Sequence, residues 1–170
     1  MATILFTDIV DSTVLAREAG DASWKRTVAM HEDVVRSVLA GFAGREIQTA
    51  GDSFLVVFDS VEGAIRCGLA LVGALNAIQL QIRVGIHSGE VVMSGDHIWG
   101  LAVHAAARIV ARAGAGEVLV SGITRDLTEG ATGLTFESRG RHRLKGLDRE
   151  HDLFAAGSSA TIWMLGRRAR

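Results

Sequence analysis

The segment REIQTAGDSFLVVF (45–58) predicts two short strands joined by a tight turn, because apolar runs flank the Gly-Asp pair of Ala50–Ser53. Upstream, TILFTDIV (3–10) is almost wholly apolar and is interrupted by Asp8, which is typical of a buried strand. A long helix capped by Asp21 is expected between them, since apolar residues recur there every three or four positions. These residues are Trp24, Val28, His31, Val35, Val38 and Phe42.

The same alternation of elements continues downstream. Ser60 is expected to cap a second long helix, and residues 80–86 alternate as a strand does. His87–Gly89 should end that strand, with residues 90–93 returning as its partner. A third helix is expected over about residues 98–112. A strand at Val118–Val120 should follow, before a short helix capped by Ser121.

This order of elements predicts an α+β fold with a ferredoxin-like β-α-β-β-α-β core and extra helices and strands after it. The chain of 170 residues is long enough for one domain with a core of its own. Residues 157–170 change in character and end in an arginine cluster. We therefore expect a domain over residues 1–156 and a C-terminal tail over 157–170.

Composition excludes several classes of protein. The net charge of −1 argues against a nucleic-acid partner or an anionic membrane surface, which usually require a basic excess. No apolar run approaches the length of a membrane span, so no membrane segment is expected in this chain. Cys67 is the single cysteine and cannot form an internal disulfide, which favours a reducing, cytoplasmic location.

Two carboxylates break the apolar pattern at informative places. Asp8 interrupts the first strand, and Asp52 lies at the tip of the hairpin. In a ferredoxin-like sheet these strand ends are neighbours, so the two side chains could converge. Without a nearby Lys or Arg they would repel each other and provide a place for Mg²⁺ or Mn²⁺. The alternative is that each Asp only forms a turn or caps a helix.

Five motifs together resemble one family. They occur in the family's order over about residues 3–155, and they resemble the catalytic domain of class III nucleotidyl cyclases, in particular the bacterial homodimeric branch. The motifs are FTDIVDST (6–13), GDSFLVVF (51–58), GIHSGEV (85–91), GLAVHAAARI (100–109) and LKG (144–146).

The resemblance implies a specific reaction. Members of this family form head-to-tail dimers whose active sites lie at the interface, so a homodimer is expected here. The 3′-hydroxyl of ATP or GTP attacks the α-phosphate and gives a 3′,5′-cyclic nucleotide and pyrophosphate. Two Mg²⁺ or Mn²⁺ ions per site assist the reaction.

The resemblance also assigns roles to residues. The metal ligands would be Asp8, Asp52 and the carbonyl of Ile9. Amides around Asp11, Ser12 and Thr13 would hold the triphosphate, as the free N–H groups of a helix start can. Arg108 would stabilise the transition state, and Lys145 would bind the terminal phosphates. A guanidinium suits an α-phosphate that gains charge.

Three positions depart from the family's pattern. Gln48 replaces the usual Lys of KTxGD, and His97 replaces the Asp that reads adenine. An amide and an imidazole can each donate or accept, so the choice between ATP and GTP stays open. His104 replaces the Asn that orients the ribose and retains a possible donor. We expect a working cyclase that is slow or accepts both bases.

Other interpretations remain open. A degenerate module would bind the nucleotide without cyclising it. A diguanylate cyclase would carry a GGDEF-type hairpin where this chain has AGDSF, and an RNA-binding domain would need more aromatic residues. His97 and His104, near two helical turns apart, could face one cleft but lack a third ligand for zinc. His31 is expected in the core, and Trp99 either in the core or against a partner.

Overall fold

The computed structural model describes residues 1–159, which form a seven-stranded sheet, a separate two-stranded hairpin and five helices. The strands are β1 (Ala2–Ile9), β2 (Arg45–Ala50), β3 (Ser53–Phe58), β4 (Ile82–Gly89), β5 (Val92–Ser94), β6 (His97–Trp99), β7 (Val118–Ser121), β8 (Leu134–Arg143) and β9 (Glu150–Ser158). The helices are α1 (Ser12–Ala19), α2 (Asp21–Ala40), α3 (Val61–Ala77), α4 (Leu101–Val110) and α5 (Gly122–Asp126).

The sheet confirms the predicted core. Its order is β2-β3-β1-β4-β7-β9-β8, and β1 therefore lies between β3 and β4, antiparallel to both. The first four strands in this order, with α2 and α3 as the connecting helices, are the ferredoxin-like arrangement. The parallel pair β4–β7 then extends the sheet toward the C-terminal hairpin of β8 and β9.

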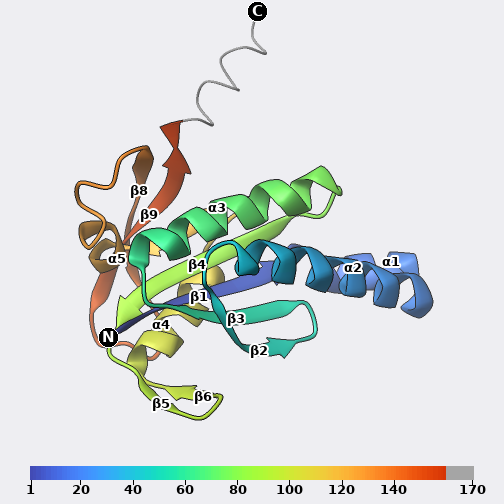
Figure 1. Ribbon diagram of the computed structural model, residues 1–170, viewed down its shortest axis with the longest axis horizontal. Helices are drawn as coiled ribbons and strands as arrows, with labels where there is room; N and C mark the ends of the chain where they lie inside the picture. Colours follow the sequence, from blue (N-terminus) through green and yellow to red (C-terminus); the bar gives the residue numbers. More distant parts are fainter. Residues whose placement is uncertain (160–170) are drawn as a thin grey trace, which may run out of the picture.

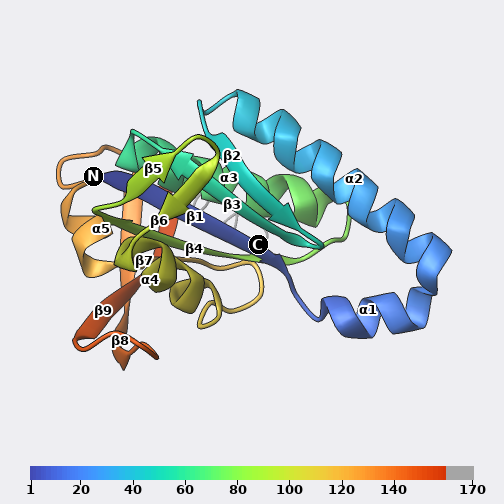
Figure 2. The same ribbon diagram turned by 90° about the horizontal axis from the view of Figure 1, so that it is seen from below.

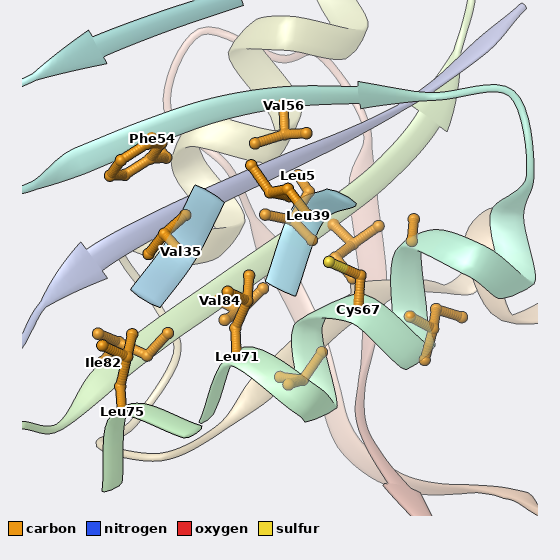
Figure 3. Close-up of a cluster of buried hydrophobic side chains, with 14 of the residues drawn as sticks. Leu5, Val35, Leu39, Phe54, Val56, Cys67, Leu71, Leu75, Ile82 and Val84 are labelled. Atoms are coloured by element: carbon orange, nitrogen blue, oxygen red, sulfur yellow. The ribbon is translucent and has the colours of Figure 1, made fainter. Parts of the chain in front are cut away.

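Two layers of structure cover the sheet. Helices α2 and α3 pack on one face, and α4 with the β5–β6 hairpin lies on the other (Figures 1 and 2). The main core fills the space under α2 and α3, where side chains from both helices meet those of the strands (Figure 3). Val35 and Leu39 of α2 contact this core beside Leu71 of α3, as their helical spacing predicts.

Several local predictions are confirmed. The turn between β2 and β3 lies at Gly51–Asp52. Ser60 accepts a hydrogen bond from the amide of Gly63 (3.0 Å) and so caps α3. Ser121 accepts one from the amide of Thr124 at the start of α5. His31 is fully buried in the core, as expected.

Other predictions are wrong. The strand over 80–86 does not end at His87, because β4 continues through Gly89 in its ladder with β1. Residues 92–94 pair with β6 instead of returning along β4. The third helix spans Leu101–Val110, so His97 is in a strand and does not lie two helical turns from His104. The short polar turn at Gly95–Asp96 joins β5 to β6, whereas the sequence predicts that a helix follows it directly.

The ends of other elements differ as well. Asp21 is the first residue of α2 and makes no side-chain cap, since Gly20 precedes the helix. Trp99 does not lie in the core, because 52% of it is exposed. Strand β9 runs to Ser158, so residues 157 and 158 of the expected tail belong to the sheet. Residues 160–170 of that tail lie outside the described residues.

No helix within residues 1–159 combines the length and the apolar character needed to cross a bilayer.

Gly85 allows α4 to lie directly on the sheet. A Cβ atom built at Gly85 would stand 2.2 Å from the backbone nitrogen of Val110, which is far inside van der Waals contact. Gly85 is the second residue of the parallel register between β4 and β7, so neither strand can move aside alone. The placement of α4 therefore depends on this glycine.

We expect Gly85→Ala to lower the free energy of unfolding by about 2 to 4 kcal/mol, since backbone must shift to admit the methyl group. Gly73→Ala is the matched control, because nothing lies within 4 Å of its Cβ position in α3. The control should raise stability by about 0.5 to 1 kcal/mol through helix propensity. Urea unfolding of both variants measures this. Equal effects would show that α4 is not packed as described.

His31 carries two buried nitrogen atoms that have no hydrogen-bond partner. Its ring lies edge-on to Phe54, with the ring centroids 5.4 Å apart. Burial lowers the pKa of His31 to about 4, with Glu32 acting weakly in the opposite direction. The folded state therefore holds this imidazole in its neutral form.

Between pH 6.5 and 4, the imidazole of His31 binds a proton in the unfolded chain but stays neutral in the folded protein. The contribution of His31 to the free energy of unfolding should thus be fully present above pH 6.5. It should decrease by about 2 to 3 kcal/mol as the pH falls toward 4. We expect His31→Leu to reduce that fall and to leave stability at pH 7 unchanged or higher. Denaturant unfolding at several pH values tests it. An unchanged pH slope in the variant would contradict the assignment.

Candidate active site at the ends of β1 and β3

Asp8 and Asp52 come to the same end of two paired strands, as the sequence predicts. The β1–β3 register places Thr7 opposite Phe54, so Asp8 and Ser53 are the next facing positions. The hydroxyl of Ser53 donates to Asp8 Oδ1 at 3.5 Å, and Asp52 is the preceding residue of the turn. Two acidic side chains from distant parts of the chain are thereby held at one edge of the sheet.

The carboxylate of Asp52 is incompletely satisfied. Its Oδ2 atom is buried and has no hydrogen-bond partner within the described structure. A buried polar atom without a partner costs free energy, and natural proteins retain few of them outside functional sites. An oxygen in this state is suited to accept a cation.

Arg83 is the site residue that sequence reasoning missed. It stands directly opposite Asp8 in the β1–β4 register, and its Nε donates to Asp8 Oδ2 at 3.0 Å while Nη2 contacts the same oxygen. The expectation that no Lys or Arg lies near the two carboxylates is therefore wrong. The sequence carries a signal for this contact, because a residue of the next central strand must face Asp8, but the apolar alternation of residues 80–86 does not reveal which one.

The donor set fits a divalent cation. Asp8 Oδ1 has only the long bond from Ser53, and Asp52 Oδ2 has none, so each carboxylate keeps an oxygen available. Within residues 1–159 there is no cluster of three or more His, Cys, Asp or Glu side chains that could hold a metal. A bound ion would need further oxygen ligands from backbone or substrate, which is the manner of Mg²⁺ with phosphates.

The start of α1 lies directly after this strand end. Ile9 is the last residue of β1, and Asp11 takes a left-handed conformation with φ of 54° before the helix begins at Ser12. The carbonyl of Asp11 accepts from the amides of Val14 and Leu15, so the amides of Ser12 and Thr13 precede the helical hydrogen bonds. Such free amides favour an anion.

A cleft of about 320 Å³ brings Gln48 and His97 together. Gln48 enters it from β2 and His97 from β6, and Phe6, Ile98 and Val103 contribute apolar wall. The imidazole of His97 stacks on the indole of Trp99, with centroids 5.7 Å apart and ring planes 27° apart. The structure thus unites the two positions at which the chain departs from the base-reading pattern.

The remaining predicted residues form a second group on α4. His104 and Arg108 are one turn apart on its exposed side. Arg108 Nε donates to the carbonyl of Lys145 at 3.3 Å, which ties α4 to the loop between β8 and β9. Buried Leu144 anchors that loop, while the side chain of Lys145 is exposed.

The two groups do not contact each other. Among the described residues, no hydrogen bond or ion pair joins Arg108 or Lys145 to Asp8 or Asp52. Each group is therefore a separate set of polar side chains on one chain, and neither set includes both these carboxylates and these cationic side chains.

Comparison with known proteins identifies the family. A sequence model of the adenylate and guanylate cyclase catalytic domain matches residues 1–164. The chain belongs to this cyclase family. A relative from Rhizobium meliloti (strain 1021), named "Putative adenylate cyclase 3", is 28% identical over 157 residues. That match covers 88% of this chain and spans 27% of the relative's length.

Solved cyclase structures share the fold. The adenylyl cyclase CyaB from P. aeruginosa superposes with a TM-score of 0.83 at 21% identity, covering 93% of this chain and 94% of that one. An adenylate/guanylate cyclase/hydrolase from Silicibacter pomeroyi gives a TM-score of 0.80 at 24% identity, with 93% and 96% covered. The α+β fold of this chain is therefore that of the class III cyclase catalytic domain.

We expect opposite stability effects from Asp52→Asn and Asp8→Asn in metal-free buffer. Asp52→Asn replaces the carboxylate whose Oδ2 atom is buried without a partner and should raise the free energy of unfolding by about 1 kcal/mol. Asp8→Asn leaves the half-buried Arg83 without its ion pair and should lower it by about 1 to 2 kcal/mol. Chemical denaturation with EDTA present measures both. Shifts of the same sign and size would refute the assigned environments.

Proposed function

We propose that this chain is a nucleotidyl cyclase that converts ATP or GTP to the 3′,5′-cyclic nucleotide and pyrophosphate in an active site completed by a second copy. The observation that carries the proposal is the unpartnered buried oxygen of Asp52, the residue before the Ser53 that donates to Asp8, in a cyclase-family domain. Stability alone gives no reason to keep such an oxygen.

The proposed division of labour follows the two groups of residues. Asp8, Asp52 and the carbonyl of Ile9 would bind two Mg²⁺ or Mn²⁺ ions, which when bound activate the 3′-hydroxyl and neutralise the leaving pyrophosphate. The amides at Ser12 and Thr13, with the Asp11 turn, would hold the triphosphate at the start of α1.

The α4 group would supply the complementary contacts. Arg108 would form charge-assisted hydrogen bonds to the α-phosphate as its charge grows, and Lys145 would bind the terminal phosphates. His104 would donate a hydrogen bond to the ribose and so orient its 3′-hydroxyl for attack. The Arg108–Lys145 contact supports this grouping, because it holds both cations at one end of α4.

A head-to-tail homodimer would join the metal group of one copy to the α4 group of the other. Within residues 1–159 no hydrogen bond or ion pair joins the two groups, which supports this arrangement. Exposed apolar side chains on the β5–β6 hairpin and at the start of α4, among them Val92, Trp99 and Leu101, offer contact area for a partner.

Gln48 and His97 would read the base, since both line the cleft between β2 and β6. Neither side chain fixes a single donor and acceptor pattern, so acceptance of both ATP and GTP follows. Losing one base contact typically weakens binding by about 10-fold to 100-fold.

A second candidate is a binding module that holds the nucleotide without cyclising it. His104 favours it, because an imidazole differs in reach and volume from an amide, and a displacement of about 1 Å can cost on the order of 100-fold in rate. Calorimetric binding of nucleotide with Mn²⁺, in the absence of cyclic product, would identify this candidate.

The direct test incubates the purified protein with Mn²⁺ and either ATP or GTP and separates the products by chromatography. We expect a cyclic 3′,5′-nucleotide and pyrophosphate from both substrates, and loss of both products in Asp52→Ala. Turnover retained in Asp52→Ala would refute the proposed metal site.

A mixing experiment tests the shared active site. Asp52→Ala and Arg108→Ala should each be inactive alone, but random mixed dimers contain one intact site, so an equal mixture should recover about one quarter of wild-type activity. The control mixture of Asp52→Ala with Asp8→Ala should stay inactive, because both changes lie in the same group. Recovery in the control, or none in the test mixture, would contradict a site built from two copies.

A further inference from the structure

An ion-pair network ties α2 to the edge strand β2. Arg36 donates two parallel hydrogen bonds to the carboxylate of Glu46, Nε to Oε2 and Nη2 to Oε1, each 3.0 Å long. The same guanidinium donates to Glu32 at 2.8 Å, and the hydroxyl of Thr49 donates to Glu46. Figure 2 shows α2 running beside β2 and β3, where these contacts bridge the two elements.

The strand is irregular at the point where the network holds it. Glu46 faces Val56 and Gln48 faces Leu55, so the register skips Ile47 as in a β-bulge. A bulge changes the alternation of side chains, and consecutive residues then point to one face. Ile47 and Gln48 accordingly both line the cleft.

The residues on either side of the bulge face the other way. Val56 and Phe54, which pair with Glu46 and Thr49, belong to the core under α2 and α3. Leu55, which pairs with Gln48, belongs to the cluster on the α4 side. The network therefore fixes both ends of the bulge on the α2 face, and the bulge aims Gln48 into the cleft on the opposite face.

The register of an edge strand needs additional contacts to hold it. β2 has a neighbour on one side only, and a slip of one residue would turn every side chain to the opposite face. Arg36 and Glu46 are partly exposed, with 45% and 30% of their side chains accessible, so the pair adds little to global stability. Its bidentate geometry nevertheless fixes the position of Glu46 relative to Arg36 closely.

We propose that Arg36, through Glu46 and Thr49, is a positioning residue that holds the β2 bulge so that Gln48 contacts the nucleotide base. This inference rests on the proposed function for its substrate. The position of Gln48 itself does not depend on that function and is measured separately below.

The first measurement follows amide hydrogen exchange over residues 46–50. Arg36→Met removes the whole network, and Glu46→Gln removes the charged fork while Arg36 stays over the Phe54 ring. Each should raise exchange in this segment by about 10-fold, with little change in the rest of the sheet. Arg66→Met is the matched control, because Arg66 pairs with Glu62 on α3 in the same i, i+4 manner as Arg36 with Glu32. It should leave exchange in β2 unchanged.

The second measurement compares kinetics with ATP and GTP. Both test variants should raise KM by about 3-fold to 10-fold and shift the ATP-to-GTP ratio of kcat/KM, with kcat changed less than about 2-fold. Arg36→Lys keeps the charge without the fork and should recover part of the loss. Arg66→Met should change neither KM nor the ratio.

The outcomes separate the two proposals. Unchanged β2 exchange in both Arg36→Met and Glu46→Gln overturns the positioning role, whatever the activity. Increased exchange with an unchanged base ratio and KM in an active enzyme also overturns it, because Gln48 would then not depend on the bulge. A wild-type protein that cyclises neither nucleotide refutes the proposed function and, with it, the role of Arg36 toward a base.

Discussion

The pairing of β1 with both β3 and β4 is the constraint on which the candidate site depends. Each ladder alone fixes one neighbour of Asp8: β3 supplies Ser53 and the turn with Asp52, and β4 supplies Arg83. A central strand can satisfy both ladders in one register only, since a slip would expose its apolar face. The core under α2 and α3 thus specifies the position of a polar site at the strand ends.

The charges of that site are only partly compensated within one chain. Arg83 neutralises Asp8, yet Asp52 keeps a buried oxygen with no partner. Replacing such a group should make a protein more stable, so its presence argues for a role that stability does not explain. The exposed Arg108 and Lys145 are also free to meet an anion from outside. Under the proposed function, cations and a second copy of the chain would complete the two halves of the site.

Prediction from the sequence succeeded where periodicity was strong and failed at short polar segments. The apolar spacing of α2 and the Gly-Asp turn of the β2–β3 hairpin each carry an unambiguous local signal. The strands of the β5–β6 hairpin have three residues each, too short for alternation to be recognised, so the sequence predicts a partner of the preceding strand over residues 90–93 and the start of a helix at residues 98–99. The Arg83–Asp8 pair is a contact between distant residues, and it becomes visible only once strand order and register are considered together.

The division of the sheet into two faces keeps the three departures from the family's pattern apart from the main core. Gln48 and His97 line the cleft on the α4 side, and His104 lies on the exposed side of α4, whereas the main core lies under α2 and α3. Gln48, His97 and His104 are not members of that core, so the contacts proposed for the base involve none of its packing. The bulge in β2 links the two faces. The ion-pair network on the α2 face holds the bulge, and the bulge places Ile47 and Gln48 on the cleft face. Under the proposed positioning role of Arg36, base preference would depend on residues that the nucleotide does not touch.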